Sequence, residues 1–273
     1  MALNVQALSE RLRQYEEGAK ASEFAKLIWR PKEGTQVVRI VPYFKTPENP
    51  LIELQFYYKL AGNNYLAPCT FGKPDPIIEV IESLRASGSN EEKLIAAKLA
   101  PTRRIYVPVI VRGEEELGVR FWGFGVQVHQ QLLRLMTETT MWGDITSVTN
   151  GNDLKVEFHK IGKKKNIKGE SFPETIIMPN PNKSPVVDPT RKDLMEKVKN
   201  QSDILNVFPL KTYEELKAIV NNYLNPTEES AVEPNNNAPA AQTPTVIPAA
   251  VSTPTDAATT KEFESFFAVD KKK

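Results

Sequence analysis

Alternation of apolar and polar positions predicts a series of short strands in the body of the chain. In residues 35–44, Val37 and Arg39 fall on one parity and Val38 and Ile40 on the other, which is the two-residue period of a strand. The same pattern predicts further strands at residues 51–60, 65–71, 103–111, 118–124, 143–149, 153–161 and 174–179. Stretches rich in Gly and Asn follow several of them and can supply hairpin turns.

Helical periodicity predicts helices between and after these strands, at residues 75–86, 90–99, 126–137, 189–200 and 212–224. Asp75-Pro76 and Asn90 are suitable cap and first-turn residues for the first two helices. Since strands and helices do not alternate regularly, the pattern favours a small antiparallel barrel with helical insertions over a parallel sheet. The expected fold class is α+β, mainly β.

The N-terminal residues, 1–28, have a helical pattern instead. Leu3, Leu8 and Leu12 recur at helical spacing with charged residues between them. Such a helix either packs on the body, residues 29–224, or serves as an arm for self-association with a neighbouring copy.

The C-terminal residues lack the composition of a folded segment. Residues 225–260 contain six prolines, eight alanines, seven threonines and no aromatic residue, so they cannot bury enough surface to fold and are expected to form a disordered linker. Residues 261–273 then place Phe263, Phe266 and Phe267 among acidic side chains. We expect this segment to dock onto partner proteins, and the alternative is that it folds back onto the body.

Charge is unevenly distributed along the chain. The formal net charge of +1 is made of +4 over residues 1–224, −6 over residues 225–270 and +3 from the last three lysines. A mildly basic body suits an acidic ligand. No apolar run is long enough to span a membrane and the start has no signal-peptide pattern, so a cytoplasmic location is expected.

Motifs that would indicate an enzyme are missing. The sequence has no GxxxxGK[ST] phosphate loop, no complete dinucleotide fingerprint and no GxSxG elbow. Cys69, the only cysteine, has no histidine near it in sequence, and His129 and His159 are more typical of packing or surface positions. The sequence therefore predicts no catalytic residues, no cofactor and no metal site.

Basic and aromatic residues on the predicted strands suggest a binding function instead. Single-stranded nucleic acid is held by cations that follow the phosphates and by aromatic rings that stack on bases. Candidate phosphate ligands are Arg39, Lys59, Arg103, Arg104, Arg120, Lys160, Lys163, Lys164, Lys165 and Lys168, and candidate stacking residues are Tyr57, Tyr58, Tyr65, Tyr106 and Trp122. Only one parity of a regular strand can face a groove, so Tyr57 and Tyr58 cannot both be right.

The order of these features resembles the single-stranded DNA-binding (helix-destabilising) proteins of T-even bacteriophages. The similar stretches are QVVRIVPYF, FYYKLAGNNYLAPC, RRIYVPVIVRG, VRFWGFG and DLKVEFHKIG, which lie in order within residues 29–224. The resemblance implies an N-terminal self-association arm and a DNA-binding core containing an OB-fold. It also implies a disordered acidic C-terminal arm that recruits replication proteins.

The sequence departs from that family in three places. The family's core commonly binds zinc through one His and three Cys, but the corresponding region YLAPCTFGKPDPIIEV supplies only Cys69, so we expect no zinc. The loop at residues 161–172 is rich in lysine where the family has stacking aromatics, so phosphate contact should dominate there. The short basic motif of the family's N-terminal arm is matched only loosely, by Ser9, Arg11 and Arg13.

Together these observations predict a sequence-independent single-stranded DNA-binding protein. We expect an OB-fold-like barrel at residues 29–224 that coats DNA during phage replication, recombination and repair, in the cytoplasm of the host. Replication and recombination proteins are the expected partners of the C-terminal segment. The alternatives are a non-catalytic scaffold that presents its aromatic residues to another protein, and an RNA-binding OB-fold protein.

Overall fold

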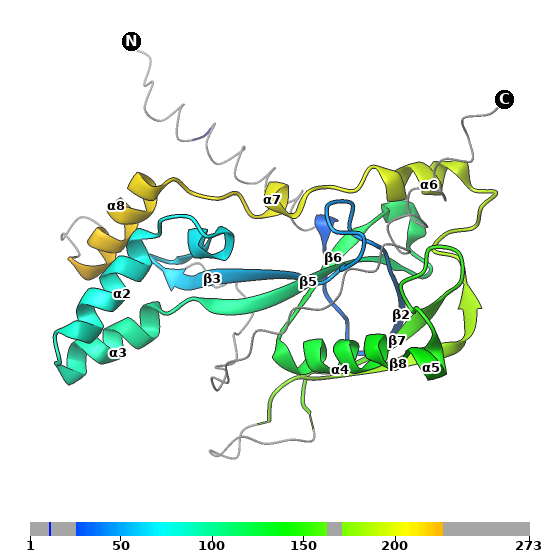
Figure 1. The fold of residues 1–273 in the computed structure, drawn as a ribbon, viewed down its shortest axis with the longest axis horizontal. Helices are drawn as coiled ribbons and strands as arrows, with labels where there is room; N and C mark the ends of the chain where they lie inside the picture. The colour runs from blue at the N-terminus through cyan, green and yellow to red at the C-terminus, as the bar shows by residue number, and fades with distance from the viewer. Residues whose placement is uncertain (1–10, 12–25, 163–170, 226–273) are drawn as a thin grey trace, which may run out of the picture. The chain divides into compact units, whose positions relative to one another are not determined.

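The structure, a computed structural model, describes residue 11 and residues 26–162 and 171–225 (Figure 1). Eight strands and seven α-helices lie within these residues, which makes the fold mixed α/β and mainly β sheet. The described residues form two compact units. Unit 1 contains residues 26–51 and 107–203, and unit 2 contains residues 52–106 and 204–225.

Unit 1 is built on a sheet with the strand order β1–β6–β5–β2–β7–β8. The strands are β1 (Ile28–Trp29), β2 (Gly34–Ile40), β5 (Thr102–Val111), β6 (Arg120–Phe124), β7 (Gly151–His159) and β8 (Glu174–Ser184). β2 pairs antiparallel with both β5 and β7, and β7 pairs antiparallel with β8. The short β1 pairs parallel with β6. The prediction of a mainly antiparallel sheet is therefore confirmed.

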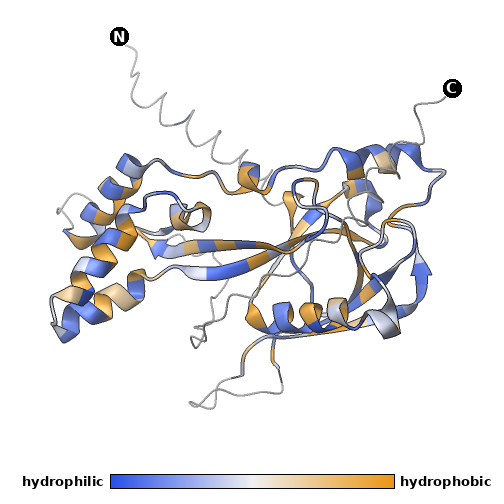
Figure 2. Cartoon of the chain, in the orientation of Figure 1, coloured by the Kyte–Doolittle hydropathy of each residue, from blue (hydrophilic) through white to orange (hydrophobic). Residues whose placement is uncertain are grey.

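The core of unit 1 follows the parity of its strands. Val38 pairs with Leu154 across β2 and β7, and both side chains are fully buried. A second apolar cluster joins Val41 and Ile110 to Leu194 and Val198 of helix α6 (Lys192–Lys199). Figure 2 shows the corresponding alternation of hydrophobic and hydrophilic residues along the strands.

Helix α4 (Val126–Thr137) protects the outer edge of β8. Gln131 donates a hydrogen bond to the carbonyl oxygen of Thr175 (2.9 Å) and accepts one from the N–H of Ile177 (3.1 Å). Its side-chain amide thus takes the place of a neighbouring strand over one step of the ladder. Further along β8, Pro179 and Pro181 have no N–H to offer.

Unit 2 contains β3 (Ile52–Leu60), which pairs with β4 (Asn63–Leu66) and with the first half of β5. Its helices are α2 (Pro76–Ala86), α3 (Asn90–Leu99), α7 (Ile204–Val207) and α8 (Tyr213–Leu224). Ile77, Ile81, Leu99, Leu216 and Val220, which come from α2, α3 and α8, pack with Tyr57 and Leu60 of β3. The helical spacing of these apolar residues explains why the sequence pattern located all three helices.

Three sequence predictions are wrong in detail. Residues 143–149 form turns because the Asp144 carboxylate accepts hydrogen bonds from the backbone and side chain of Thr146, which compete with strand pairing. The strand predicted at 65–71 ends at Leu66, and Pro68 begins the 3₁₀ turn η1 (Pro68–Phe71). The predicted N-terminal helix does not include Ile28, which lies in β1.

Two short helices were not predicted, α7 and α5 (Thr139–Trp142). Each has four residues, which is too short for helical periodicity to register. Another short 3₁₀ turn, η2 (Glu115–Leu117), occupies the link between β5 and β6. Within the described part of the chain, no helix has the length and apolar character needed to cross a bilayer.

Candidate nucleic-acid interface

Two strands of unit 2 bring aromatic and basic side chains onto one face. β3 and β5 run antiparallel, with Leu54 opposite Arg104. Residues directly opposite each other, and residues two apart in one strand, point to the same side of a sheet. Phe56 and Tyr58 of β3 therefore share a face with Arg104 and Tyr106 of β5. These four side chains are called the Tyr58 face below.

The rings of the Tyr58 face are in contact. The ring centroid of Phe56 lies 5.9 Å from that of Tyr58 and 6.0 Å from that of Tyr106. Phe208, just after α7, covers Phe56 and Tyr106 at 4.9 and 5.0 Å. Phe56 and Tyr106 are therefore buried, whereas Tyr58 and Arg104 are half-buried and reach the surface.

The electrostatics of Tyr58 suit stacking. Burial raises the pKa of its hydroxyl, and the positive charge of Arg104 offsets part of this rise. The phenol is therefore neutral at physiological pH, and it lies beside a permanent cation. A partly exposed neutral ring next to a guanidinium can stack on a base while the cation attracts the adjoining phosphate.

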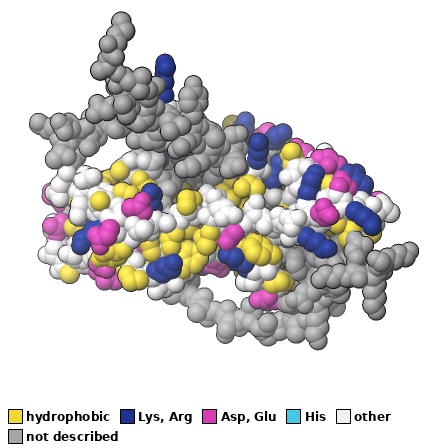
Figure 3. Space-filling view, turned by 90° about the horizontal axis from the view of Figure 1, so that it is seen from above, with side chains coloured by type: hydrophobic (Ala, Val, Ile, Leu, Met, Phe, Trp, Pro, Cys, Tyr) yellow, Lys and Arg dark blue, Asp and Glu magenta, His cyan; other side chains and the backbone are white. Residues whose placement is uncertain are grey.

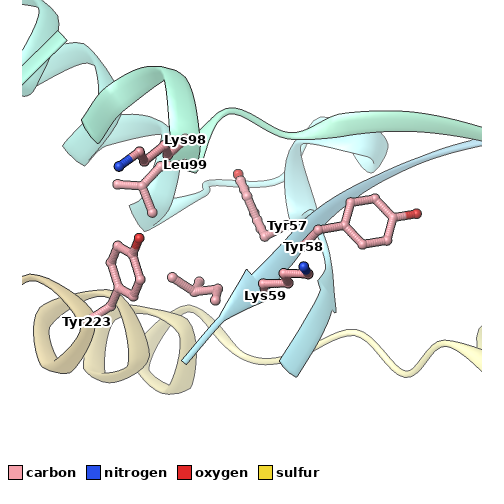
Figure 4. A pocket seen from close by; sticks show the side chains of 7 residues that line it. Tyr57, Tyr58, Lys59, Lys98, Leu99 and Tyr223 are labelled. Atoms are coloured by element: carbon pink, nitrogen blue, oxygen red, sulfur yellow. The ribbon is translucent and has the colours of Figure 1, made fainter. Parts of the chain in front are cut away.

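The neighbouring Tyr57 points into the core, so its prediction as a stacking residue is wrong. Its exposed fraction is only 2%, and its hydroxyl donates a hydrogen bond of 2.7 Å to the Asp75 carboxylate. Figure 4 shows the rings of Tyr57 and Tyr58 directed to different sides of the strand. Burial and the bond to Asp75 raise the pKa of the Tyr57 hydroxyl far above its usual value. Tyr58 is the member of the pair that a base can reach.

The remaining candidates in unit 2 differ in accessibility. Arg103 is exposed and forms an ion pair of 3.1 Å with Glu53. Lys59 is exposed at the end of β3. Tyr65 is half-buried and packs against the apolar core of the unit. Tyr106 is buried under Phe208, so it supports the Tyr58 face rather than offering a free ring.

Two arginines predicted to bind phosphates are structural in unit 1. Arg39 is fully buried, and its Nη2 donates hydrogen bonds to the carbonyl oxygens of Ser147 (2.5 Å) and Ser184 (2.8 Å). Arg120 is 8% exposed and pairs with Glu114 at 2.6 Å. These side chains are inside the unit, so we remove both arginines from the candidate interface.

Trp122 is also removed. It is 1% exposed and packs edge-on against Trp29, with ring centroids 5.4 Å apart. Lys160, by contrast, is exposed where β7 ends, and its backbone N–H is fixed by the Glu33 carboxylate (2.7 Å). The other loop lysines, Lys163, Lys164, Lys165 and Lys168, and the C-terminal Phe263, Phe266 and Phe267 lie outside the described residues.

An exposed aromatic residue that the sequence analysis missed is Phe44, which is 39% exposed in the turn after β2. The ammonium group of Lys45 lies 5.8 Å from its ring centroid. Asp203 accepts hydrogen bonds from the hydroxyl of Tyr43 (2.9 Å) and from Lys45, which anchors the residues on both sides. The sequence pattern predicted that Phe44 ends a strand, although Pro42 and Pro47 on either side of it indicate a turn.

Charged residues of both signs are interspersed on the face seen in Figure 3. Several basic side chains of the described residues are already paired with carboxylates, as Arg112 is with Asp153 (2.7 Å) and Arg191 with Asp193 (2.8 Å). The local density of lysine and arginine therefore does not by itself identify a candidate interface.

The region that corresponds to the family's zinc site does not fit a zinc ion. The Sγ of Cys69 lies 3.8 Å from the amide oxygen of Gln55, and burial raises the pKa of the thiol. The nearby Asp75 carboxylate accepts hydrogen bonds from Tyr57 and from the N–H groups of Cys69 (3.3 Å) and Ile77 (3.1 Å). Among the residues that are described, no three His, Cys, Asp or Glu side chains form a cluster suited to a metal.

Asp75 therefore connects β3, η1 and the start of α2. Asp75→Ala is expected to lower the free energy of unfolding by about 2 kcal/mol, because it removes a helix cap and leaves the buried Tyr57 hydroxyl without its acceptor. Thermal unfolding measures the effect. A chelator should leave the melting temperature of the unaltered protein unchanged, and a large chelator-induced drop would contradict this account.

The family of the chain follows from a comparison with known proteins. A family model described as gp32 DNA binding protein-like matches residues 32–224, which is well over half of the 273 residues. In a comparison with curated proteins, none matches the chain. The matched range begins just before β2 and ends with α8, so it includes the Tyr58 face. The chain belongs to the gp32 DNA binding protein-like family.

Proposed function

We propose that this protein binds single-stranded DNA without sequence preference and without catalysis. The observation that carries the proposal is the Tyr58 face, where a half-buried tyrosine lies beside an arginine on a platform of packed rings. Stacking requires a base whose face is free, which a duplex does not offer. Rings accept any base and phosphates carry no code, so binding should depend little on sequence.

We also infer that unit 1 is an OB-fold. In that fold the first strand lies between the second and the fourth, the third lies beside the second, the fifth lies beside the fourth, and a helix connects the third to the fourth. Taking β2, β5, β6, β7 and β8 as these five strands, the pairing order agrees, and α4 connects β6 to β7.

This assignment supports DNA binding in a second way. OB-folds bind oligonucleotides with the face of the second and third strands and with the loops between the first and second strands and between the fourth and fifth. The first of these loops corresponds to residues 41–101, which contain most of unit 2 and Phe44. The second corresponds to residues 160–173, which contain the run of lysines. Cations thus lie in both of these loops, and most of the aromatic residues lie in the first.

The finer role proposed is that of a phage protein in the host cytoplasm that coats single strands during replication, recombination and repair. Residues 1–28 would mediate contact between neighbouring copies. Residues 225–260 would be a flexible tether, and residues 261–273 would recruit replication proteins through Phe263, Phe266 and Phe267. The acidic charge of residues 225–270 supports weak competition with DNA for the basic body.

A salt titration of binding to a fluorescein-labelled dT oligomer tests the proposal. If five or six phosphates are neutralised, log K should fall with log salt at a slope of about −4, and the single strand should bind at least tenfold more tightly than the duplex, on the order expected for stacking. A labelled oligomer is used because Trp29 and Trp122 are buried and would report poorly on stacking, and Trp142 is itself half-buried.

The alternatives give different results. Equal or absent binding to both DNA forms would overturn the proposal and favour a protein-interaction scaffold. Clear preference for an RNA oligomer of the same length over dT would favour the RNA-binding alternative. A slope near zero would contradict the electrostatic part of the model.

A further inference from the structure

Unit 1 has a surface groove that takes no part in the proposed DNA interface. Its volume is about 440 Å³, and one of its walls is apolar, formed by Leu27, Leu117 and Val119. Leu117 belongs to η2 and is 62% exposed, although a leucine side chain gains free energy when it leaves water. The groove therefore offers an apolar surface on which a further side chain can pack. We call it the Leu117 groove.

The opposite wall of the Leu117 groove is helix α6, and Glu116 joins this helix to η2. The Glu116 carboxylate accepts hydrogen bonds from Arg191, just before α6, and from Lys197 within it. Lys197 also donates to the carbonyl oxygen of Glu116 (2.8 Å). Three hydrogen bonds thus converge on the residue before Leu117, and they hold the two walls of the groove in place.

One carboxylate on the α6 wall is not neutralised by a neighbour. Asp193 forms an ion pair with Arg191 (2.8 Å), and Lys197 forms one with Glu116 (3.2 Å). Glu196 also lines the groove and is exposed, and in the part of the chain that is described no cation lies at ion-pair distance from it. A segment that brings an apolar side chain and a cation would therefore match both walls.

The residues that directly precede Leu27 have this composition. Lys26 and Leu27 are helical, and the chain passes from Leu27 into β1. The helical pattern of residues 1–28 places the positions three and seven residues before Leu27 on its face, and these are Phe24 and Lys20. An aromatic ring and a cation are therefore expected on the same face as Leu27, which already lines the groove.

The C-terminal phenylalanines fit the groove less well. Residues 261–270 carry three carboxylates and one lysine, so docking them would bring further negative charge to Glu196. Residues 20–26 carry two lysines and one glutamate, and they are joined to the groove wall through Leu27. The connection is short, so closing it costs little chain entropy.

We propose that residues 20–26 of the same chain dock in the Leu117 groove, with the Phe24 ring on the apolar wall and the Lys20 ammonium group beside Glu196. This inference goes beyond the proposed function, because it divides the N-terminal region into two parts. Residues 20–26 belong to unit 1, and residues 1–19 remain available to a neighbouring copy. The docked segment determines where residues 1–19 leave unit 1.

Disulfide trapping in the full chain tests the docking. In a Cys69→Ser background, Leu117→Cys is combined with Phe24→Cys or, as the matched control, with Ala25→Cys. Ala25 is one residue closer to Leu27, so a freely moving tether would bring its thiol to Leu117 at least as fast. A docked helix turns Ala25 away from the groove. The Phe24→Cys pair should therefore form an intramolecular disulfide on the order of tenfold faster, because the bond requires closely approaching Cβ atoms.

Two results of this experiment would overturn the docking. Equal rates for the two pairs would show that the segment is only tethered near the groove. Disulfides that form between two molecules would assign the groove to the segment of a neighbouring copy.

Thermal unfolding gives an independent measurement. Phe24→Ala should lower the melting temperature of the full chain by about 4 °C, since it removes a ring that packs on the apolar wall. Leu8→Ala, in residues 1–19, should melt as wild type does, and a Phe24→Ala protein that also melts as wild type does would contradict the proposal. Neither measurement involves DNA, so the proposed function can fail while the docking holds, and the reverse.

Discussion

Arg39→Ala is expected to destabilise unit 1 strongly rather than to weaken DNA binding directly. The fully buried guanidinium donates to the carbonyl oxygens of Ser147 and Ser184 and lies 3.9 Å from Asp153. Removing it takes one donor away from each of these acceptors and opens a space in the core. Loss of one partner from a buried charged network costs about 3–5 kcal/mol. The melting temperature should fall by roughly 10 °C.

Chemical and thermal denaturation measure this effect, and an exposed arginine provides the control. Arg103→Ala removes the same type of side chain from a surface ion pair, so stability should change by less than about 1 kcal/mol. An Arg39→Ala protein that melts like wild type and yet loses dT affinity would show that Arg39 contacts DNA after all, and it would return Arg39 to the interface.

Tyr58→Ala is expected to weaken dT binding by about 5- to 150-fold, which corresponds to the loss of one base stacked on an aromatic ring at about 1–3 kcal/mol. Stability should change little because the ring is only half-buried at the edge of the cluster. Tyr58→Phe keeps the ring and should keep most of the affinity. A hydrogen-bonding role for the hydroxyl would instead reduce affinity equally in both variants.

The adjacent tyrosine is the matched control for this experiment. Tyr57→Phe removes the hydroxyl that donates to Asp75 inside unit 2, so it should lower stability by about 1 kcal/mol and leave dT affinity unchanged. Fluorescence anisotropy and thermal unfolding of both variants separate the two effects. If Tyr57→Phe lost affinity while Tyr58→Ala did not, the assignment of the two sides of β3 would be reversed.

The sequence shows that these two tyrosines point to opposite sides of the strand, but not which of them faces the core. A period of two places Tyr57 and Tyr58 on opposite sides of any regular strand. Which side is buried depends on α2, α3 and α8, and α8 lies more than 150 residues away in sequence. Long-range packing of this kind has no signal in the pattern of the strand itself.

Arg39 was misassigned for a similar reason. A charged residue within an apolar strand is usually exposed, and the local pattern gave no reason to expect otherwise. Its hydrogen-bond acceptors are main-chain oxygens 108 and 145 residues further along the chain. Main-chain acceptors can come from any residue type, so no side-chain motif identifies them. The helices, whose apolar periodicity is local, were located more accurately.

The division into two units was also not apparent from the sequence. The chain crosses between the units at residues 51/52, 106/107 and 203/204, and the second crossing lies within β5, where the alternating pattern of the strand continues through it. One strand of a continuous sheet belongs to both units, so the usual signals of a domain boundary do not arise at this crossing.

The hydrogen bonds of the Gln131 amide affect how the edge of β8 can interact with another copy of the protein. Copies of a protein that lie side by side along a nucleic acid meet at high local concentration, where an open strand edge can recruit the same edge of a neighbour and start aggregation. Gln131 occupies one outward-facing donor and one outward-facing acceptor of β8, and Pro179 and Pro181 have no N–H to donate. This edge therefore offers fewer free groups for intermolecular sheet formation than an uncovered strand edge would.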